Sequence, residues 1–152
     1  MKILIDADGC PVVKQATQIA KENNIEVVIF CDTSHIINSD HAQIITVSKG
    51  ADSVDFALVN EVKSGDIVVT QDYGLAAMVL SKGGKAITQN GMIISDSNLG
   101  LLLTTRYESK KARMSGAHLK GPKKRTAQND EEFIKSFKSM LNVDQFVQKV
   151  CF

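Results

Sequence analysis

The sequence predicts an α/β fold: a three-layer domain in which a mostly parallel central sheet is flanked by helices. Short runs of consecutive apolar, often β-branched residues recur along the chain, as in strands that are buried on both faces. Segments with helical periodicity lie between these runs, and this alternation favours parallel strands joined by helical crossovers. The length of 152 residues suits one core, so we expect a single domain over residues 1–152.

Each predicted strand is an apolar run that ends at a polar residue or a turn. The five expected strands cover residues 3–5, 25–30, 44–47, 66–70 and 85–88. Between the first two, Pro11 suits the first turn of a helix, and the apolar residues that follow repeat every three to four positions. Further helices are expected over residues 51–62 and 75–80, and glycines follow both of them.

The last third of the chain predicts a basic loop and a C-terminal helix. Residues 99–105 suit a short helix, and residues 106–125, which contain two glycines and a proline, look like an extended loop. An amphipathic helix is expected at about residues 130–141, because apolar side chains fall there at helical spacing. These side chains are Phe133, Ile134, Phe137, Met140 and Leu141.

Basic residues are concentrated in the predicted loop. Residues 106–125 contain eight Lys and Arg against one acid, Glu108, a local charge of +7, whereas the whole chain carries +1 and the remainder is therefore acidic. Such a segment suits an anionic partner such as a phosphodiester backbone. The residues expected to contact it are Lys110, Lys111, Arg113, Lys120, Lys123, Lys124 and Arg125.

Several features favour a cytoplasmic protein. Acid arrives at Asp6, too early for the apolar core of a signal peptide, and no apolar run is long enough to span a membrane. The three cysteines are widely spaced and predict neither a disulfide framework nor a zinc site, and the three histidines lack partners at metal-ligand spacing. The apolar tail, residues 146–152, would pack on the body or on a second subunit, which leaves a homodimer open.

Acidic residues fall where this architecture would place a site. Asp6 and Asp8 follow the first strand, Asp72 follows the fourth, and Asp52 and Asp55 begin the middle helix. If the first and fourth strands are neighbours, these carboxylates converge, and such a cluster normally persists around a cation. Oxygen ligands without nearby His or Cys suit Mg²⁺ or Mn²⁺. The plainer alternative is that each aspartate serves a local turn or helix cap.

Four motifs, in this order, resemble a known family. They are ILIDADGCPV at residues 3–12, GADSVD at 50–55, GDIVVTQDYGLA at 65–76 and KGPKKR at 120–125. Together they resemble the YaiI/YqxD family of uncharacterised bacterial proteins, from residue 1 to about residue 141. At one remove the pattern is similar to PIN-like domains, which are metal-dependent nucleases.

The PIN-like resemblance implies roles for individual residues. Asp6 matches the acid after the first strand, either Asp52 or Asp55 matches the helix acid, and Thr70-Gln71-Asp72 matches the last element. Asp8 would be an additional ligand. The resemblance implies a nuclease that uses Mg²⁺ or Mn²⁺, with Asp6 and Asp72 in catalysis, Thr70 against the substrate, and RNA as the expected partner rather than DNA.

Two other functions remain open on the sequence. Asp6 and Asp8 fit the nucleophile and general acid of a haloacid-dehalogenase-type phosphatase, with Thr70 and either Lys82 or Lys85 on the phosphate, although the paired acidic motif of that family is missing. Alternatively, the chain binds nucleic acid without catalysis. In that case the basic segment would hold the backbone, because Tyr107 is the only aromatic residue within it and offers no stacking platform.

Overall fold

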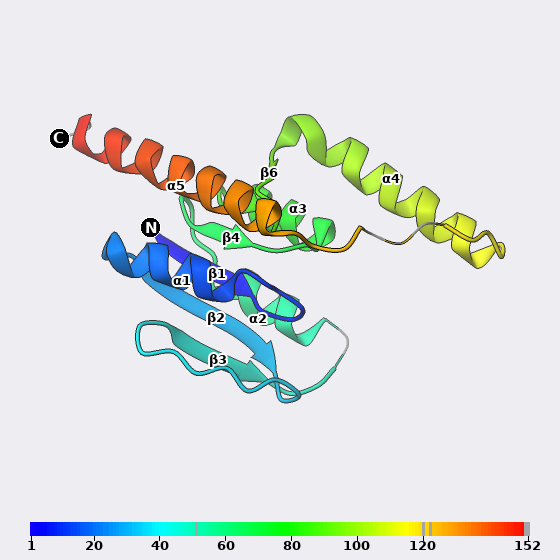
Figure 1. Cartoon of the computed structure of the whole chain (residues 1–152), viewed down its shortest axis with the longest axis horizontal. Helices are drawn as coiled ribbons and strands as arrows, with labels where there is room; N and C mark the ends of the chain where they lie inside the picture. Colours follow the sequence, from blue (N-terminus) through cyan, green and yellow to red (C-terminus); the bar gives the residue numbers. More distant parts are fainter. Residues whose placement is uncertain (51, 120, 122, 151–152) are drawn as a thin grey trace.

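A single sheet organises the fold (Figure 1). The computed structural model describes residues 1–50, 52–119, 121 and 123–150, the last eight of these by their backbone alone. Within them a six-stranded sheet has the order β3-β2-β1-β4-β5-β6. The strands are β1 Lys2–Asp6, β2 Glu26–Asp32, β3 Gln43–Val47, β4 Ile67–Val69, β5 Lys85–Ile87 and β6 Ile93–Ile94. All neighbours are parallel except β5 and β6, which confirms the mostly parallel sheet.

Helices cover both faces of the sheet and make the expected three layers. They are α1 Val13–Glu22, α2 Ser53–Glu61, α3 Tyr73–Ser81, α4 Asp96–Met114 and α5 Ala127–Val150. Residues of α1 and α5 share one core cluster with alternate strand residues, and residues of α2 and α3 share a second cluster with the others. Ile3 and Ile5 of β1 belong to the first cluster and Leu4 to the second, which is the two-residue alternation of a strand buried on both sides.

The strand order places a crevice between β1 and β4. These two strands are direct neighbours, and from them the chain winds outward in opposite directions along the sheet. Ile5 is paired with Val69, so Asp6 and Thr70 occupy the next position on each strand at the carboxyl edge. Ligands of such sheets bind beyond this edge at the point where the strand order reverses. The condition on which the predicted cluster of carboxylates depended is therefore met.

The predicted loop at residues 106–125 is wrong for its first nine residues. Residues 106–114 continue the helix that the sequence predicts at 99–105, and together they form most of α4. The basic residues hid the helix, because Lys, Arg, Leu, Met and Glu are good helix formers and no glycine or proline interrupts residues 101–114. Figure 1 shows α4 leaving the body on the side to which the strand arrows point.

Two further differences from the sequence-based expectations concern α5 and β6. The C-terminal helix, expected at about residues 130–141, runs over Ala127–Val150. The short strand β6 was not predicted, because two residues are too few to show a period. Its partner β5 is reached through a turn at Gly91, whose φ of +85° and whose approach to the Glu132 carbonyl exclude a side chain.

The remaining sequence-based expectations concern membrane spans, cysteines and the C-terminal tail, and they can be compared with the structure only within the described residues. None of the helices there is both long and apolar enough to cross a membrane. Cys10 and Cys31 are free thiols. Lys120 and Cys151 lie outside the described residues, and the side chains of the apolar tail that could pair two subunits do so as well.

Candidate functional site

A cavity of about 450 Å³ opens at the carboxyl edge of the sheet, where β1, β2 and β4 end and α2 and α3 begin. All five aspartates singled out in the sequence line it. They are Asp6, Asp8, Asp52, Asp55 and Asp72. Three separate segments of the chain bring them there, so the grouping follows from the strand order rather than from one local turn.

The side chain of Asp6 is held by a hydrogen bond from Thr70. Thr70 donates a hydrogen bond from Oγ1 to Oδ2 of Asp6 over 3.0 Å, and the same hydroxyl accepts one from the backbone N–H of Asp72, also over 3.0 Å. Thr70 is only 2% exposed and does not line the cavity. The resemblance implies a contact between Thr70 and the substrate, whereas the structure makes this residue a support for Asp6 and Asp72.

Burial raises the pKa of Asp6 above its usual value. The hydrogen bond from Thr70 opposes that rise, and the negative charges of Asp72 and Asp8 add to it. A nearby positive charge would favour the ionised form of this carboxyl group.

Asp72 is both a helix cap and a member of the cavity. Its Oδ1 accepts hydrogen bonds from the backbone N–H groups of Gly74 (2.9 Å) and Leu75 (3.2 Å) and so begins α3. Arg106 donates a third bond to the same oxygen from Nη1, over 3.0 Å. Burial tends to raise the pKa of Asp72, but the Leu75 N–H, the Arg106 guanidinium and the Gly74 N–H outweigh it, and the pKa is lowered.

Asp52 and Asp55 stand at the first turn of α2. Asp52 occupies the N-cap position with φ of +62°, a left-handed conformation that aspartate tolerates, yet its side chain makes no capping bond. Burial, followed by the charges of Asp72, Asp6 and Asp52, raises the pKa of Asp55 to about 6. Crowding of these carboxyl groups therefore favours a proton on Asp55 in the empty cavity, and a cation between them would relieve it.

The donor chemistry of the cavity fits a hard divalent cation. Carboxylate oxygens dominate its lining, and Arg106 is the single cationic side chain among the described residues that line it; this environment suits Mg²⁺ or Mn²⁺. No three His, Cys, Asp or Glu side chains among the described residues are already arranged to hold a metal ion. Binding would therefore require these carboxylates to turn toward a shared cation.

Among the polar residues that line the cavity, the sequence alone assigned no role to Asp32 or Arg106. Asp32 ends β2 as Asp6 ends β1, so the strand pattern contained the signal. Arg106 follows Leu99 and Leu102 at helical spacing, and both leucines pack on the body, so extending the helix past residue 105 would have pointed Arg106 inward.

A histidine links two of these acids, although the sequence gives it no partner. His35 Nδ1 lies 3.2 Å from Asp32 Oδ1, and its Nε2 lies 3.4 Å from Asp8 Oδ1. The side chain and backbone of Ser34 also bond to Asp32, and with His35 they lower the pKa of Asp32. His35 therefore lies between Asp8 and the end of β2 at the side of the cavity.

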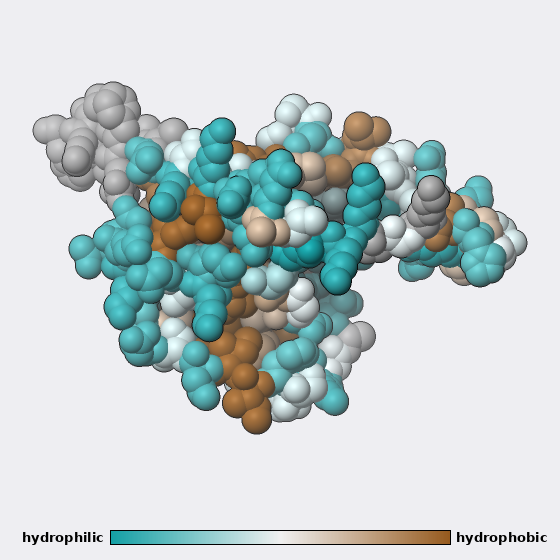
Figure 2. Space-filling view, in the orientation of Figure 1, coloured by the Kyte–Doolittle hydropathy of each residue, from teal (hydrophilic) through white to brown (hydrophobic). Residues whose placement is uncertain are grey.

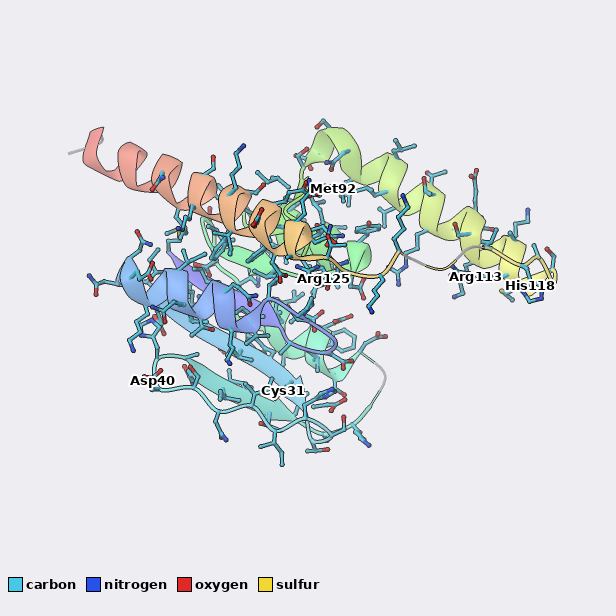
Figure 3. The ribbon with its side chains drawn as sticks, viewed as in Figure 1. Cys31, Asp40, Met92, Arg113, His118 and Arg125 are labelled. Carbon is cyan, nitrogen blue, oxygen red and sulfur yellow. The ribbon has the colours of Figure 1, made fainter. Side chains whose placement is uncertain are left out.

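The lysines and arginines expected to contact the anionic partner, called the cationic rim from here on, lie in different parts of the structure. Lys110, Lys111 and Arg113 are exposed on the outer half of α4, and Lys123 and Lys124 are exposed on the segment that returns to α5. In Figure 3, Arg113 and His118 lie at the far end of this projection, whereas Arg125 lies back beside the start of α5.

Arg125, which the sequence placed among the residues expected to contact the nucleic acid, is engaged within the protein. Its guanidinium donates to Asp130 Oδ1 (2.9 and 2.7 Å), to Asn90 Oδ1 (2.8 Å) and to the Gln89 carbonyl (2.9 Å). These bonds fasten the start of α5 to the turn between β5 and β6. Because its guanidinium is bonded to three acceptors within the protein, Arg125 has a structural role here.

The lysines that a phosphatase would use lie away from the cavity. Lys85 begins β5 and is paired with Ile67 at the amino edge of the sheet, opposite the edge where Asp6 stands. Lys82 donates to the carbonyl of Val59 at the end of α2. Neither lysine lines the cavity that contains Asp6 and Asp8.

Comparison with known proteins adds the family. The family model described as "Uncharacterized BCR, YaiI/YqxD family" matches residues 4–143. The chain belongs to the YaiI/YqxD family. A UPF0178 protein of Clostridium acetobutylicum is 48% identical over 143 residues, which are 93% of this chain and 97% of that protein. A UPF0178 protein of Exiguobacterium sibiricum is 50% identical over 141 residues, 93% and 96% of the two chains.

The membership confirms the resemblance stated from the four motifs. These relatives match over nearly their whole length, so the cavity and α4 both lie within the shared region. No solved structure matches the chain significantly.

Proposed function

We propose that this protein is a divalent-metal-dependent nuclease that hydrolyses phosphodiesters, with RNA as its main substrate. One observation carries the proposal: five aspartates from separate segments line a single cavity at the sheet's reversal point, and an arginine joins them there. Acid-lined cavities of this kind suit a metal that binds a phosphate oxygen, and the neighbouring guanidinium suits a second oxygen of the same phosphate.

The cation would be held by carboxylates at the carboxyl edge. Asp6 ends β1, Asp72 follows β4 at the start of α3, Asp8 stands beside them, and Asp52 and Asp55 approach from the start of α2. When bound, Mg²⁺ or Mn²⁺ would supply a water of lowered pKa and neutralise charge at the scissile phosphate. The charge balance favours such a partner, because a cation would offset the burial and the neighbouring negative charges that together raise the pKa of Asp55 to about 6.

The remaining residues bind and orient. Thr70 fixes the carboxylate of Asp6, and the N-terminus of α3 fixes that of Asp72. Arg106 reaches the cavity from α4 with its side chain half exposed, so an incoming phosphate can take the guanidinium from Asp72. Beyond it, the cations on the outer half of α4 lie where flanking phosphates would pass.

A cleavage assay with matched aspartate variants tests the proposal. Wild type, Asp55→Asn and Asp40→Asn are incubated with labelled single-stranded RNA or DNA, with Mn²⁺ or with chelator. Asp40 pairs with Lys21 on the surface, and Figure 3 shows it far from the projecting end of α4, so the control changes the same charge elsewhere. We expect metal-dependent cleavage by wild type and Asp40→Asn, and a loss in Asp55→Asn that exceeds the roughly 10–100-fold typical of supporting residues.

Two results would contradict the nuclease. Cleavage that survives in chelator removes the metal from the reaction. Equal cleavage by Asp55→Asn and wild type removes Asp55 from the reaction and contradicts a metal site that includes it.

A non-catalytic nucleic-acid-binding protein is the second candidate. The observation that favours it is that, among the described side chains, none are prearranged around a metal while Arg106 already neutralises Asp72. It predicts no cleavage under any of these conditions. It also predicts that binding of labelled RNA is insensitive to Mn²⁺ and to Asp55→Asn.

A further inference from the structure

The outer half of α4 is a cationic projection that the core does not need. Residues 103–114, called the arm from here on, extend beyond the packing contacts that Leu99 and Leu102 make with α3 and β6. No residue of α4 is fully buried, and Figure 1 shows the arm standing clear of the sheet. Isolated helices of this length have marginal stability in water, so a helix that projects from the body would be stabilised by binding a partner.

The charges on the arm identify the chemistry of that partner. Lys110, Lys111 and Arg113 are exposed, and within the described residues they form no ion pair, whereas Arg106 and Arg125 are already engaged. Figure 2 shows hydrophilic side chains over much of the same projecting part of the molecule. Three unpaired cations within one turn of helix suit closely spaced phosphates, such as those of a nucleic-acid backbone.

Neither the cavity nor the arm offers a place for a base. None of the described residues that line the cavity is aromatic, and Val54 is the only wholly apolar side chain among them. Tyr107 is the only aromatic residue in the whole of residues 96–125. Proteins that hold single strands without reading their sequence usually stack successive bases on aromatic side chains, and the arm cannot do this.

We propose that the arm binds the sugar–phosphate backbone of a double-helical segment and holds the strand that continues from it at the cavity, without reading base sequence. This proposal rests on the proposed function and names its substrate class: a duplex or hairpin that flanks the cleaved phosphodiester. Its basis is the juxtaposition of Arg106 in the cavity with unpaired cations further along the same helix.

The arm sets the length of duplex that contributes. From Arg106 to Arg113 the helix rises about 10 Å at 1.5 Å per residue. A duplex carries one charge per roughly 1.7 Å of axis, so the arm spans about six phosphates, or some three base pairs counted on both strands. Stems longer than about four base pairs should therefore gain little further affinity from the arm.

The test measures binding without turnover. Fluorescence anisotropy is recorded in chelator with labelled RNA hairpins of graded stem length, DNA hairpins of the same sequence and unstructured single strands. The variants are Lys110→Ala/Lys111→Ala/Arg113→Ala and, as matched control, Lys14→Ala/Lys135→Ala/Lys138→Ala, which removes three exposed lysines of α1 and α5. Thermal unfolding shows that each variant remains folded.

We expect hairpins to bind more tightly than single strands, with a plateau beyond about four base pairs. The arm variant should lose at least about tenfold in affinity at low salt, and its slope of log affinity against log salt should flatten by roughly two to three. The control triple should leave both unchanged. Equal binding of RNA and DNA hairpins assigns the shared backbone chemistry, and tighter binding of the RNA hairpin assigns an A-form helix; both support the proposal.

Other results would overturn it. If single strands bind as tightly as hairpins, or if the arm variant keeps the wild-type salt slope, the arm does not bind a duplex. A protein that is dimeric by light scattering, and becomes monomeric when the arm is altered, assigns the arm to a second copy of the chain. The outcome can be distinguished from that of the nuclease assay. Hairpin binding without any cleavage would contradict only the proposed activity. Cleavage that is unchanged in the arm variant would contradict only this inference.

Discussion

Arg106 of α4 donates a hydrogen bond from Nη1 to Oδ1 of Asp72, 3.0 Å away, and so joins the projecting helix to the acidic cavity. The same oxygen accepts the two backbone N–H groups that begin α3. One carboxylate therefore connects the start of α3 to the middle of α4 at the edge of the cavity.

Replacing Arg106 by glutamine is expected to tighten binding of Mn²⁺ in the absence of nucleic acid. The guanidinium repels an incoming cation and competes for Asp72, and removing about 1 kcal/mol of such repulsion corresponds to a gain of about fivefold. Isothermal titration calorimetry at low ionic strength measures this. Arg113→Gln is the control, because it removes the same charge from the outer part of the same helix.

Unchanged or weaker Mn²⁺ binding in Arg106→Gln would show that the ion is bound away from Asp72. The free energy of unfolding should change little, since the Arg106 side chain is 55% exposed and exposed ion pairs contribute under about 1 kcal/mol.

Replacing Asp55 by asparagine is expected to stabilise the metal-free protein at neutral pH. The pKa of Asp55 is raised from 3.8 to about 6 in the folded state, so the folded chain binds more protons than the unfolded chain between these values. Its contribution to the free energy of unfolding therefore falls as pH rises through this window. At pH 7.5 the variant should unfold about 2–4 °C higher, for a gain of about 1 kcal/mol after solvent screening.

The difference between Asp55→Asn and wild type should disappear near pH 4, where both carry a neutral side chain at position 55. Differential scanning fluorimetry across pH 4 to 8 follows it. Asp40→Asn should show no such gain, because Lys21 lowers the pKa of Asp40. A lower unfolding temperature for Asp55→Asn at pH 7.5 would contradict the crowding of carboxyl groups in the cavity.

Replacing Arg125 by alanine is expected to cost stability and leave nucleic-acid binding intact. Its bonds to Asp130, Asn90 and the Gln89 carbonyl hold the start of α5, and hydrogen bonds of charged groups contribute about 1.5–3 kcal/mol when removed. Chemical denaturation measures the loss. Arg125→Lys should recover little of it, because lysine cannot reproduce the forked geometry.

The alternative role for Arg125 makes the opposite prediction. A phosphate contact would leave stability unchanged, and its removal would reduce the salt slope of binding by about one. That result would return Arg125 to the cationic rim.

The sequence predicted the position of the acidic cavity better than that of the cations. Buried parallel strands and their carboxyl ends leave a clear pattern, so Asp6 and Asp72 could be placed once β1 and β4 were neighbours. The role of Arg125 depends on partners 35 and 36 residues away along the chain, which no local pattern records. The helix at residues 106–114 was hidden for another reason: basic composition suggested a solvated loop although the same residues favour helix.

Replacing Thr70 by valine tests the support beneath the cavity. Valine keeps the shape but removes the hydroxyl, which leaves Oδ2 of Asp6 and the backbone N–H of Asp72 without their partner. Because Thr70 is 2% exposed, we expect a loss of about 1–3 kcal/mol in the free energy of unfolding. Cleavage should fall by roughly 10–100-fold, as for other residues that orient metal ligands.

The pH profile separates positioning from a merely structural role. The Thr70 hydrogen bond opposes the burial that raises the pKa of Asp6, so without it that pKa rises further. The acid limb of the cleavage profile should therefore move to higher pH in Thr70→Val. Thr70→Ser, which keeps the hydroxyl, should retain the wild-type limb. A Thr70→Val profile that matches wild type, with activity lost only in proportion to unfolded protein, would reduce Thr70 to a packing residue and leave Asp6 dependent on β1 alone.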